Sequence, residues 1–126
     1  MTEQRFPKGE KLKSKREISL LFEKGKWQTC GNLRVISLDL ETKPQENISI
    51  SHQKFGVSVS KRNLKKAVDR NRIKRLLREC YRLQKPSFSK AFGTHSLTMM
   101  FWISKELPKN YREVENEFLR LCKSKK

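Results

Sequence analysis

Residues 55–83 read FGVSVSKRNLKKAVDRNRIKRLLRECYRL, a strand pattern followed by a loop and a helix pattern. Apolar and small side chains alternate at its start, so Phe55, Val57 and Val59 share one face of a strand. From residue 67 the apolar period becomes that of a helix, which turns by about 100° per residue. The apolar arc of this helix consists of Ile73, Leu76, Leu77, Cys80 and Leu83. The stretch therefore predicts a strand and an amphipathic helix that share one core.

The outer side of this helix and the loop before it are almost entirely cationic. Residues 61–82 carry ten basic and two acidic side chains, a net charge of +8, in a chain of 126 residues with a total charge of +17. Rows of like charges destabilise a helix by about 0.2–0.5 kcal/mol per pair, and RNA phosphates would supply the missing acidic partners. The predicted RNA-binding residues are Lys61, Arg62, Lys65, Lys66, Arg70, Asn71, Arg72, Lys74, Arg75, Arg78 and Arg82.

Two other interpretations of the cationic helix stay open at this point, a solvated surface helix and a helix on an anionic membrane. An interfacial membrane helix carries large aromatic anchors on its apolar side, whereas this arc holds Ile, Leu and Cys. RNA is favoured over duplex DNA because the sequence contains no zinc finger, leucine zipper or convincing helix-turn-helix.

The length of the chain predicts one domain, spanning residues 1–126. Ser14 and Glu17 form a capping box for a first helix that ends before Gly25. Helices are predicted at residues 14–24, 67–83 and 110–123, strands at residues 32–40, 48–51, 55–60 and 97–103, and loops at residues 41–47 and 84–94. The order helix, three strands, helix, strand, helix predicts an α+β fold, a two-layer α/β sandwich with helices packed on one sheet.

The composition argues against membrane-spanning, secreted and disulfide-rich proteins. No apolar run approaches the roughly 20 residues that span a bilayer, and the N-terminal segment has no apolar signal region. The three cysteines are far apart and form no disulfide framework. We therefore expect a cytoplasmic protein without a membrane partner.

The sequence predicts no catalytic site made by the protein itself. Metal-dependent phosphodiester cleavage needs clustered carboxylates, whereas Asp69 and Glu79 lie about 15 Å apart along the predicted helix. His52 and His95 are predicted to be isolated surface histidines. We therefore expect neither catalytic residues nor a stably bound metal in this chain.

The segments around the cationic helix resemble a known family. Residues 55–62 (FGVSVSKR) and 65–79 (KKAVDRNRIKRLLRE) are similar to the signature of the protein subunit of bacterial ribonuclease P. The centre of the signature is Arg70, Asn71, Arg72, Ile73, Lys74, Arg75 and Arg78. Residues 11–26 (KLKSKREISLLFEKGK) resemble the first helix of the family. One departure is the loop at residues 64–66, which is one residue longer than in many relatives and lacks their glycine.

The resemblance implies an α/β sandwich with an unusual left-handed βαβ crossover. It also implies a role as the protein subunit of a ribonucleoprotein endoribonuclease, whose catalytic RNA carries the active site and the Mg²⁺ ions. This ribonucleoprotein removes the 5′ leader from precursor tRNA by endonucleolytic cleavage. The expected partners are therefore the catalytic RNA and precursor tRNA, with no obligate protein partner.

The resemblance further implies a cleft between the first helix and the sheet, which holds the single-stranded leader. The implied cleft residues are Ile18, Phe22, Arg34, Ile36, Lys54 and Phe55. Ile18 and Ile36 stand where relatives have aromatic side chains, so the leader would depend more on apolar contact and on a basic side chain. Trp27 stays open as a base-stacking residue, and Trp102 is predicted to lie in the core.

Two alternative functions remain at this stage. Composition alone fits a ribosomal or other structural RNA-binding protein without a role in cleavage. A protein-only nuclease is the second alternative, and it would require the two histidines and the two carboxylates named above to form a site.

Overall fold

The computed structural model describes residues 11–12, 14–41 and 53–124 of the chain. Along the chain the elements are α1 (Lys15–Lys24), β1 (Lys26–Cys30), β2 (Leu33–Asp39), β3 (Lys54–Val59), α2 (Ala67–Leu83), α3 (Lys85–Phe92), β4 (Ser96–Trp102) and α4 (Tyr111–Ser124). The predicted strand at residues 48–51 and His52 lie outside the described residues. Within the described part of the chain, no helix is long and apolar enough to cross a membrane.

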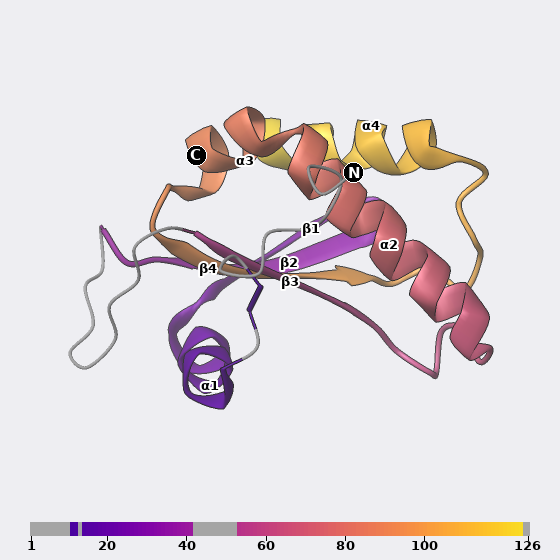
Figure 1. The fold of residues 1–126 in the computed structure, drawn as a ribbon, viewed down its shortest axis with the longest axis horizontal. Coiled ribbons are helices and arrows are strands. Elements are labelled where there is room, and N and C mark those ends of the chain that lie inside the picture. The colour runs from indigo at the N-terminus through magenta and orange to yellow at the C-terminus, as the bar shows by residue number, and fades with distance from the viewer. Residues whose placement is uncertain (1–10, 13, 42–52, 125–126) are drawn as a thin grey trace, which may run out of the picture.

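The strands form one mixed sheet in the order β1-β2-β4-β3. β2 is antiparallel to both β1 and β4, and β3 runs parallel to β4. α2, α3 and α4 cover one face of this sheet, and α1 lies against the other face (Figure 1). The predicted α+β fold with helices packed on a sheet is therefore confirmed, and α1 covers part of the second face.

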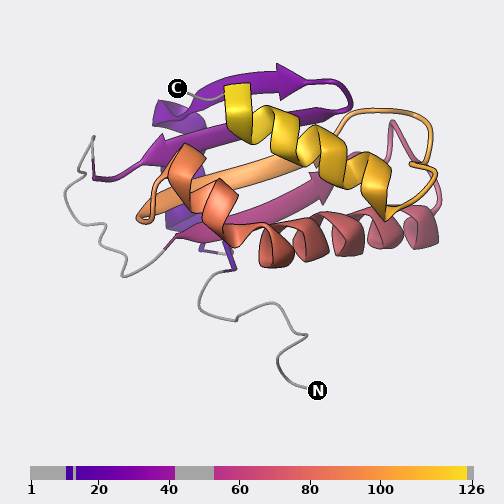
Figure 2. The same cartoon turned by 90° about the horizontal axis from the view of Figure 1, so that it is seen from above.

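The connection from β3 to β4 has the uncommon hand for a parallel crossover. The chain leaves β3, returns along α2 and α3, and enters β4 beside β3. In Figure 2 the helices α2, α3 and α4 face the viewer, β3 and β4 point to the right, and β4 lies above β3. This arrangement is a left-handed crossover, whereas about 98% of such connections are right-handed.

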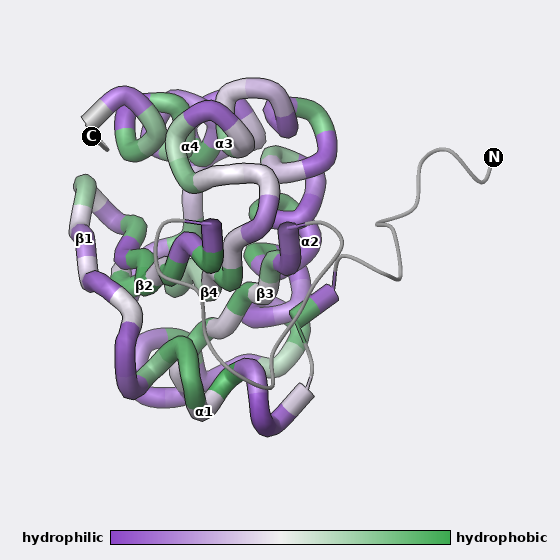
Figure 3. Tube along the Cα trace, turned by 90° about the vertical axis from the view of Figure 1, so that its left-hand side faces the viewer, coloured by the Kyte–Doolittle hydropathy of each residue, from purple (hydrophilic) through white to green (hydrophobic). Residues whose placement is uncertain are grey.

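Strand alternation divides the buried side chains between the two faces of the sheet. Successive side chains of a strand point to opposite faces, so β2 places Val35 in the core under α3 and α4, and Ile36 under α1. The large side chains of the first core include Phe55, Tyr81, Phe88, Trp102 and Phe118. The smaller core under α1 consists of Leu12, Leu21, Ile36, Leu38, Leu40 and Leu97. Figure 3 shows apolar segments on both sides of the sheet, and Trp102 lies in the core as predicted.

The buried arc of α2 is rotated from the predicted one. Cys80 is buried as predicted, whereas Leu83 is 48% exposed. Tyr81 is buried in its place, with its ring stacked on Phe55 at a centroid distance of 4.4 Å. The hydroxyl of Tyr81 accepts a hydrogen bond from Nε2 of Gln53 at 3.0 Å. The pair of stacked rings therefore takes the buried position at this end of the helix, and Leu83 lies outside it.

Residues 85–92 form α3, although the sequence predicted a loop there. Pro86 stands in the first turn, where a helix tolerates proline, and Gly93 ends the helix with a φ of 98°. Phe88 and Phe92 lie one turn apart and are both buried. The prediction was wrong because proline and serine obscured this apolar period.

β1 is a strand that the sequence pattern did not identify. Gly31 and Asn32 form the turn between β1 and β2, and Gly31 has a φ of 58°, which glycine adopts readily. The backbone N–H and the side-chain amide of Asn32 donate to the carboxylate of Glu117 at 2.7 and 3.0 Å. The hairpin is therefore anchored to α4, and the Gly-Asn pair is its signal in the sequence.

Candidate nucleic-acid interface

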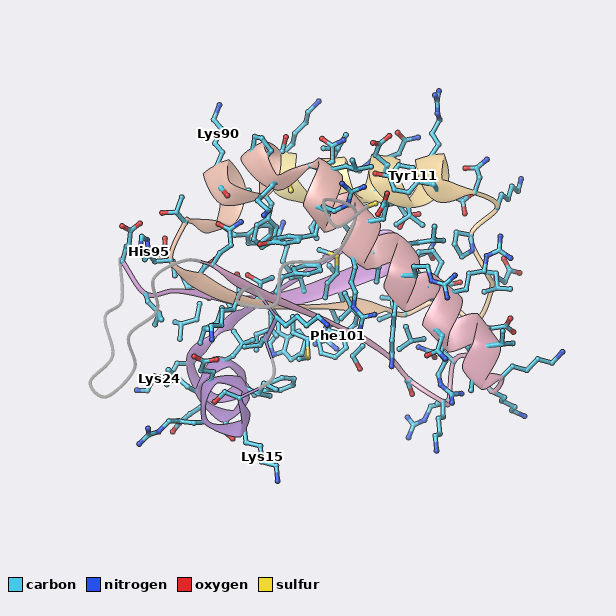
Figure 4. All side chains as sticks on the ribbon, in the orientation of Figure 1. Lys15, Lys24, Lys90, His95, Phe101 and Tyr111 are labelled. Atoms are coloured by element: carbon cyan, nitrogen blue, oxygen red, sulfur yellow. The ribbon has the colours of Figure 1, made fainter. Side chains whose placement is uncertain are left out.

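The outer side of α2 and the loop before it present cations to solvent. The exposed residues among those predicted to bind RNA are together named the basic surface. They are Lys61, Arg62, Lys65, Lys66, Asn71, Arg72, Arg75 and Arg78. Long side chains project from the outer side of α2 (Figure 4). Arg72, Arg75 and Arg78 form no ion pair with any residue that the structure describes. Their charges are therefore available to an anionic partner.

Arg82 lies at the end of α2 and is paired with an acid. Its Nη2 lies 2.7 Å from Oε2 of Glu79, and its Nε donates to Oε1 at 3.3 Å. The hydrogen bond to Glu79 raises the pKa of Arg82 above its ordinary value. Arg82 is thus partly neutralised within the helix and offers less free charge than the basic surface.

Arg70 is directed back toward the preceding loop. Its Nη1 donates to the carbonyl oxygens of Leu64 and Lys65, each at 2.8 Å. Arg70 and Lys74 are both half-buried, unlike the residues of the basic surface. The Arg70-Asn71-Arg72 triplet therefore divides into one side chain that binds its own backbone and two that face solvent.

Four of the residues implied for a leader cleft lie on the α1 side of the molecule, in different settings. Phe22 and Arg34 are exposed. Ile18 is half-buried against the core under α1. Lys54 forms an ion pair with Glu17 of α1, with Nζ 3.4 Å from Oε1.

Ile36 and Phe55 do not line a cleft, and the prediction for them is wrong. Ile36 is 0% exposed and lies under α1 with Leu21. Phe55 is 1% exposed and lies on the opposite face of the sheet, against Tyr81. The reason is strand alternation: Phe55 points with Val59 toward α2, so it cannot also reach the α1 side.

An exposed hollow does lie on the α1 side, but most of its lining residues differ from those that the sequence implied for the leader cleft. It has a volume of about 160 Å³, is named the aromatic hollow, and is lined by Phe22, Trp27, Arg34, Ser60, Asn63, Phe101, Trp102 and Ile103. The rings of Phe22, Trp27 and Phe101 contact one another with centroid distances of 5.8, 6.2 and 5.6 Å. The guanidinium carbon of Arg34 lies 4.2 Å from the centroid of the Trp27 ring.

The aromatic hollow forms because α1 ends before it covers the whole sheet face. The strand register places Arg34 opposite Phe101, and Trp27 lies on the neighbouring strand β1. Phe22 reaches these rings from the last turns of α1, which ends at Lys24. Figure 4 shows Phe101 on the α1 side of the sheet and Tyr111 on the other side. Exposed rings beside a guanidinium provide surfaces on which nucleic-acid bases stack.

Sequence reasoning left Trp27 open and did not identify Phe101. Phe101 lies in an apolar run in which each residue is consistent with a buried strand. In the structure Met100 and Trp102 enter the core under the helices, and Phe101 points to the opposite face. The signal for Phe101 was strand alternation, which places it on the opposite face of the sheet from Trp102. Alternation does not tell whether a helix covers that face.

Among the residues that the structure describes, the titratable groups away from these surfaces form no nuclease-like site. No group of three or more His, Cys, Asp and Glu within residues 11–12, 14–41 and 53–124 is placed to hold a metal ion. Nδ1 of His95 lies 3.5 Å from Oε2 of Glu41, at the end of the sheet remote from the start of α2 (Figure 4).

Burial raises the pKa of the Cys80 thiol to about 12 and that of the Cys122 thiol to about 11. Both thiols are therefore protonated at neutral pH.

Known proteins share this sequence and fold. The family model described as Ribonuclease P matches residues 6–126. The ribonuclease P protein component of Petrotoga mobilis is 32% identical over 128 residues, which cover 98% of this chain and 97% of that protein. That of Methylococcus capsulatus is 37% identical over 79 residues, 63% of this chain, and the match spans 56% of the relative's length.

A solved structure agrees with the sequence comparisons at the level of the fold. The ribonuclease P protein of Staphylococcus aureus superposes with a TM-score of 0.70 at 22% identity, covering 91% of this chain and 94% of that one. The family model matches nearly the whole chain, and the relative from Petrotoga mobilis is 32% identical over 98% of it. The chain belongs to the ribonuclease P protein family.

Proposed function

We propose that this chain is the protein subunit of a ribonuclease P ribonucleoprotein and assists a catalytic RNA in removing the 5′ leader from precursor tRNA. The observation that carries the proposal is the placement of two complementary surfaces next to each other. The basic surface suits RNA phosphates, and the aromatic hollow suits unpaired bases. Residues 60–66 join the two, since Ser60 and Asn63 line the hollow.

In this proposal the basic surface binds the catalytic RNA. Each Lys or Arg that neutralises a phosphate releases a condensed counterion, which favours binding and makes it depend on salt. Arginine suits this role because its planar fork contacts two phosphate oxygens at once. The cations also screen the repulsion between the catalytic RNA and its tRNA substrate.

The aromatic hollow takes the single-stranded leader in this proposal. Stacking of a base on an aromatic side chain contributes about 1–3 kcal/mol. The rings of Trp27 and Phe22 are 44% and 46% exposed, so a base can reach them. Arg34 stacks on Trp27 and adds a positive charge at the same place.

The chemical step belongs to the RNA in this proposal. The described residues do not fit a protein-held metal site, so no step is assigned to a metal bound by this chain. The Mg²⁺ ions that the reaction uses would be held by the catalytic RNA and the substrate. In this proposal the protein acts in the cytoplasm.

A cleavage assay with purified components tests the proposal. Precursor tRNA is incubated with the catalytic RNA alone, the protein alone, or both, at a low Mg²⁺ concentration. We expect cleavage at the 5′ end of the mature tRNA to be stimulated by the protein and to be absent with the protein alone. Cleavage by the protein without the RNA would contradict the proposal.

The RNA that co-purifies with the tagged protein from cells provides a second test. Enrichment of the catalytic RNA and precursor tRNA is expected. Enrichment of ribosomal RNA alone would favour a structural RNA-binding protein instead.

A further inference from the structure

The loop at residues 60–66 connects the aromatic hollow with the basic surface. Ser60 and Asn63 line the hollow. The cations of the same loop are exposed to solvent and are Lys61, Arg62, Lys65 and Lys66. A change in the conformation of this loop would therefore alter both surfaces at once.

The first half of the loop is held by Ser60. Its carbonyl oxygen accepts hydrogen bonds from the backbone N–H groups of Asn63 and Leu64, both at 3.1 Å. Its hydroxyl accepts a hydrogen bond from the N–H of Arg62 at 3.0 Å. The side chain of Leu64 is 6% exposed and packs in the core. This half is therefore tied to the end of β3, and Leu64 links it to the second half because Arg70 binds the carbonyl oxygen of Leu64.

The second half of the loop is held by Arg70, in the first turn of α2. Nη1 of Arg70 donates to the carbonyl oxygens of Leu64 and Lys65, each at 2.8 Å. Lys66, the residue before the helix, makes no side-chain capping hydrogen bond. A guanidinium holds its donors in a fixed plane, so one nitrogen can satisfy two neighbouring carbonyls. Arg70 thus ties the loop to the first turn of α2.

We propose that Arg70 is a positioning residue, which holds this loop in the conformation that aligns the aromatic hollow with the basic surface. The functional half of this inference rests on the proposed function, and the structural half rests on the hydrogen bonds of Arg70. Arg72 is the matched control, because it lies two residues further along α2 and carries the same charge. Its side chain is exposed and forms no ion pair with a described residue.

Amide hydrogen exchange on the free protein tests the structural half. In Arg70→Gln, the N–H groups of Asn63 and Leu64 should exchange about tenfold faster, because the loop opens locally. The amides in the middle of α2 should keep their rates in this variant. Arg72→Gln removes the same charge and should leave the exchange rates of the loop amides unchanged. Unchanged exchange at Asn63 and Leu64 in Arg70→Gln overturns the proposal.

Arg70→Lys is the second variant, for use if Arg70→Gln does not give the native circular dichroism spectrum. It keeps the positive charge but lacks the planar fork. We expect exchange at Asn63 and Leu64 to accelerate by about threefold. Native rates in this variant would show that an ammonium holds the loop as well as the planar fork, and would overturn the claim that the guanidinium positions it.

The contribution of the leader to binding tests the functional half. It is measured as the ratio of affinities for precursor tRNA and mature tRNA, with the catalytic RNA present. Arg70→Gln should lower this ratio by about threefold or more, although Arg70 does not line the aromatic hollow. Arg72→Gln should weaken binding of both substrates equally and leave the ratio unchanged.

The outcomes of the two experiments separate the two claims. If Arg70→Gln weakens the binding of precursor and mature tRNA equally, Arg70 acts as a simple phosphate contact. The proposed effect of Arg70 on the aromatic hollow is then overturned. If the native protein itself shows no preference for precursor tRNA, the proposed leader site fails. The hydrogen-exchange result then still decides the role of Arg70 in the loop.

Discussion

The basic surface and the aromatic hollow are neighbours, but they are built in opposite ways. The basic surface comes from one continuous segment, residues 61–78, and its cations repel one another. The aromatic hollow takes its lining from α1, three strands and two loops. Charges act over a Debye length of about 8–10 Å, whereas stacked rings need direct contact. We therefore expect salt to control the first surface and backbone geometry to control the second.

The scaffold under both surfaces has the largest expected effect. Phe55→Ala should lower the free energy of unfolding by about 3–5 kcal/mol, because it removes a buried ring that stacks on Tyr81. Phe22→Ala removes a ring that is 46% exposed and should cost less than about 1 kcal/mol. Urea unfolding of the two variants measures the difference. An equal loss in the free energy of unfolding would contradict the placement of Phe55 in the core and Phe22 at the surface.

The basic surface has the next largest effect. The triple variant Arg72→Gln, Arg75→Gln, Arg78→Gln should weaken binding of the catalytic RNA by about a hundredfold at physiological salt. The magnitude of the slope of log affinity against log salt should fall by about two to three, since three phosphate contacts are lost. Titrations at several salt concentrations measure both quantities.

A matched triple variant on α4 and the segment before it controls for net charge. It consists of Lys109→Gln, Arg112→Gln and Arg120→Gln, which are all exposed. We expect a smaller loss of affinity and a nearly native salt slope. The same loss in both triple variants would mean that diffuse charge, and not the outer face of α2, binds the RNA.

For the aromatic hollow we expect a loss of affinity that does not depend on salt, unlike that of the basic surface. Trp27→Ala removes the ring that contacts Phe22, Phe101 and Arg34. The affinity for precursor tRNA should fall by about 1–3 kcal/mol relative to mature tRNA, with no change in the salt slope. Leu107→Ala truncates an apolar side chain of similar exposure (38%) outside the hollow and should have no such effect. A native preference for precursor tRNA in Trp27→Ala would exclude the hollow as the leader site.

The smallest expected effect concerns the residue that combines both properties. Arg34→Lys keeps the charge but loses the planar group over the Trp27 ring. The preference for precursor tRNA should fall by about two- to fivefold, with an unchanged salt slope. Competition binding between the two tRNA forms resolves a change of this size. A native preference in this variant would show that Arg34 contributes charge alone.

Local patterns predicted most of the elements and failed where a pattern was interrupted. The capping box at Ser14 and the alternation in residues 55–59 both correspond to observed elements. The proline and serines of α3 concealed a helix, because its apolar period has only two phenylalanines. β1 was missed because a short strand at a sheet edge has a weak alternation signal.

The part of the candidate site that comes from one segment of the chain could be predicted, and the part assembled from several elements could not. The exposed cations of α2 follow from one helical period, and the sequence identifies them directly. The leader cleft did not follow in this way, since Ile36 and Phe55 proved to be buried and Phe101 was missed. The difference arises because exposure of a strand residue depends on which helix covers its face.

The sequence by itself determined the cationic helix, the apolar period under it and the family to which the chain belongs. These properties depend on neighbours along the chain, whose spacing is given by the geometry of a helix or a strand. Only the tertiary structure decided that Phe22, Trp27 and Phe101 meet, and that Arg70 turns back to its own loop. These contacts depend on where α1 ends and how the strands align, which is a packing outcome of the whole chain.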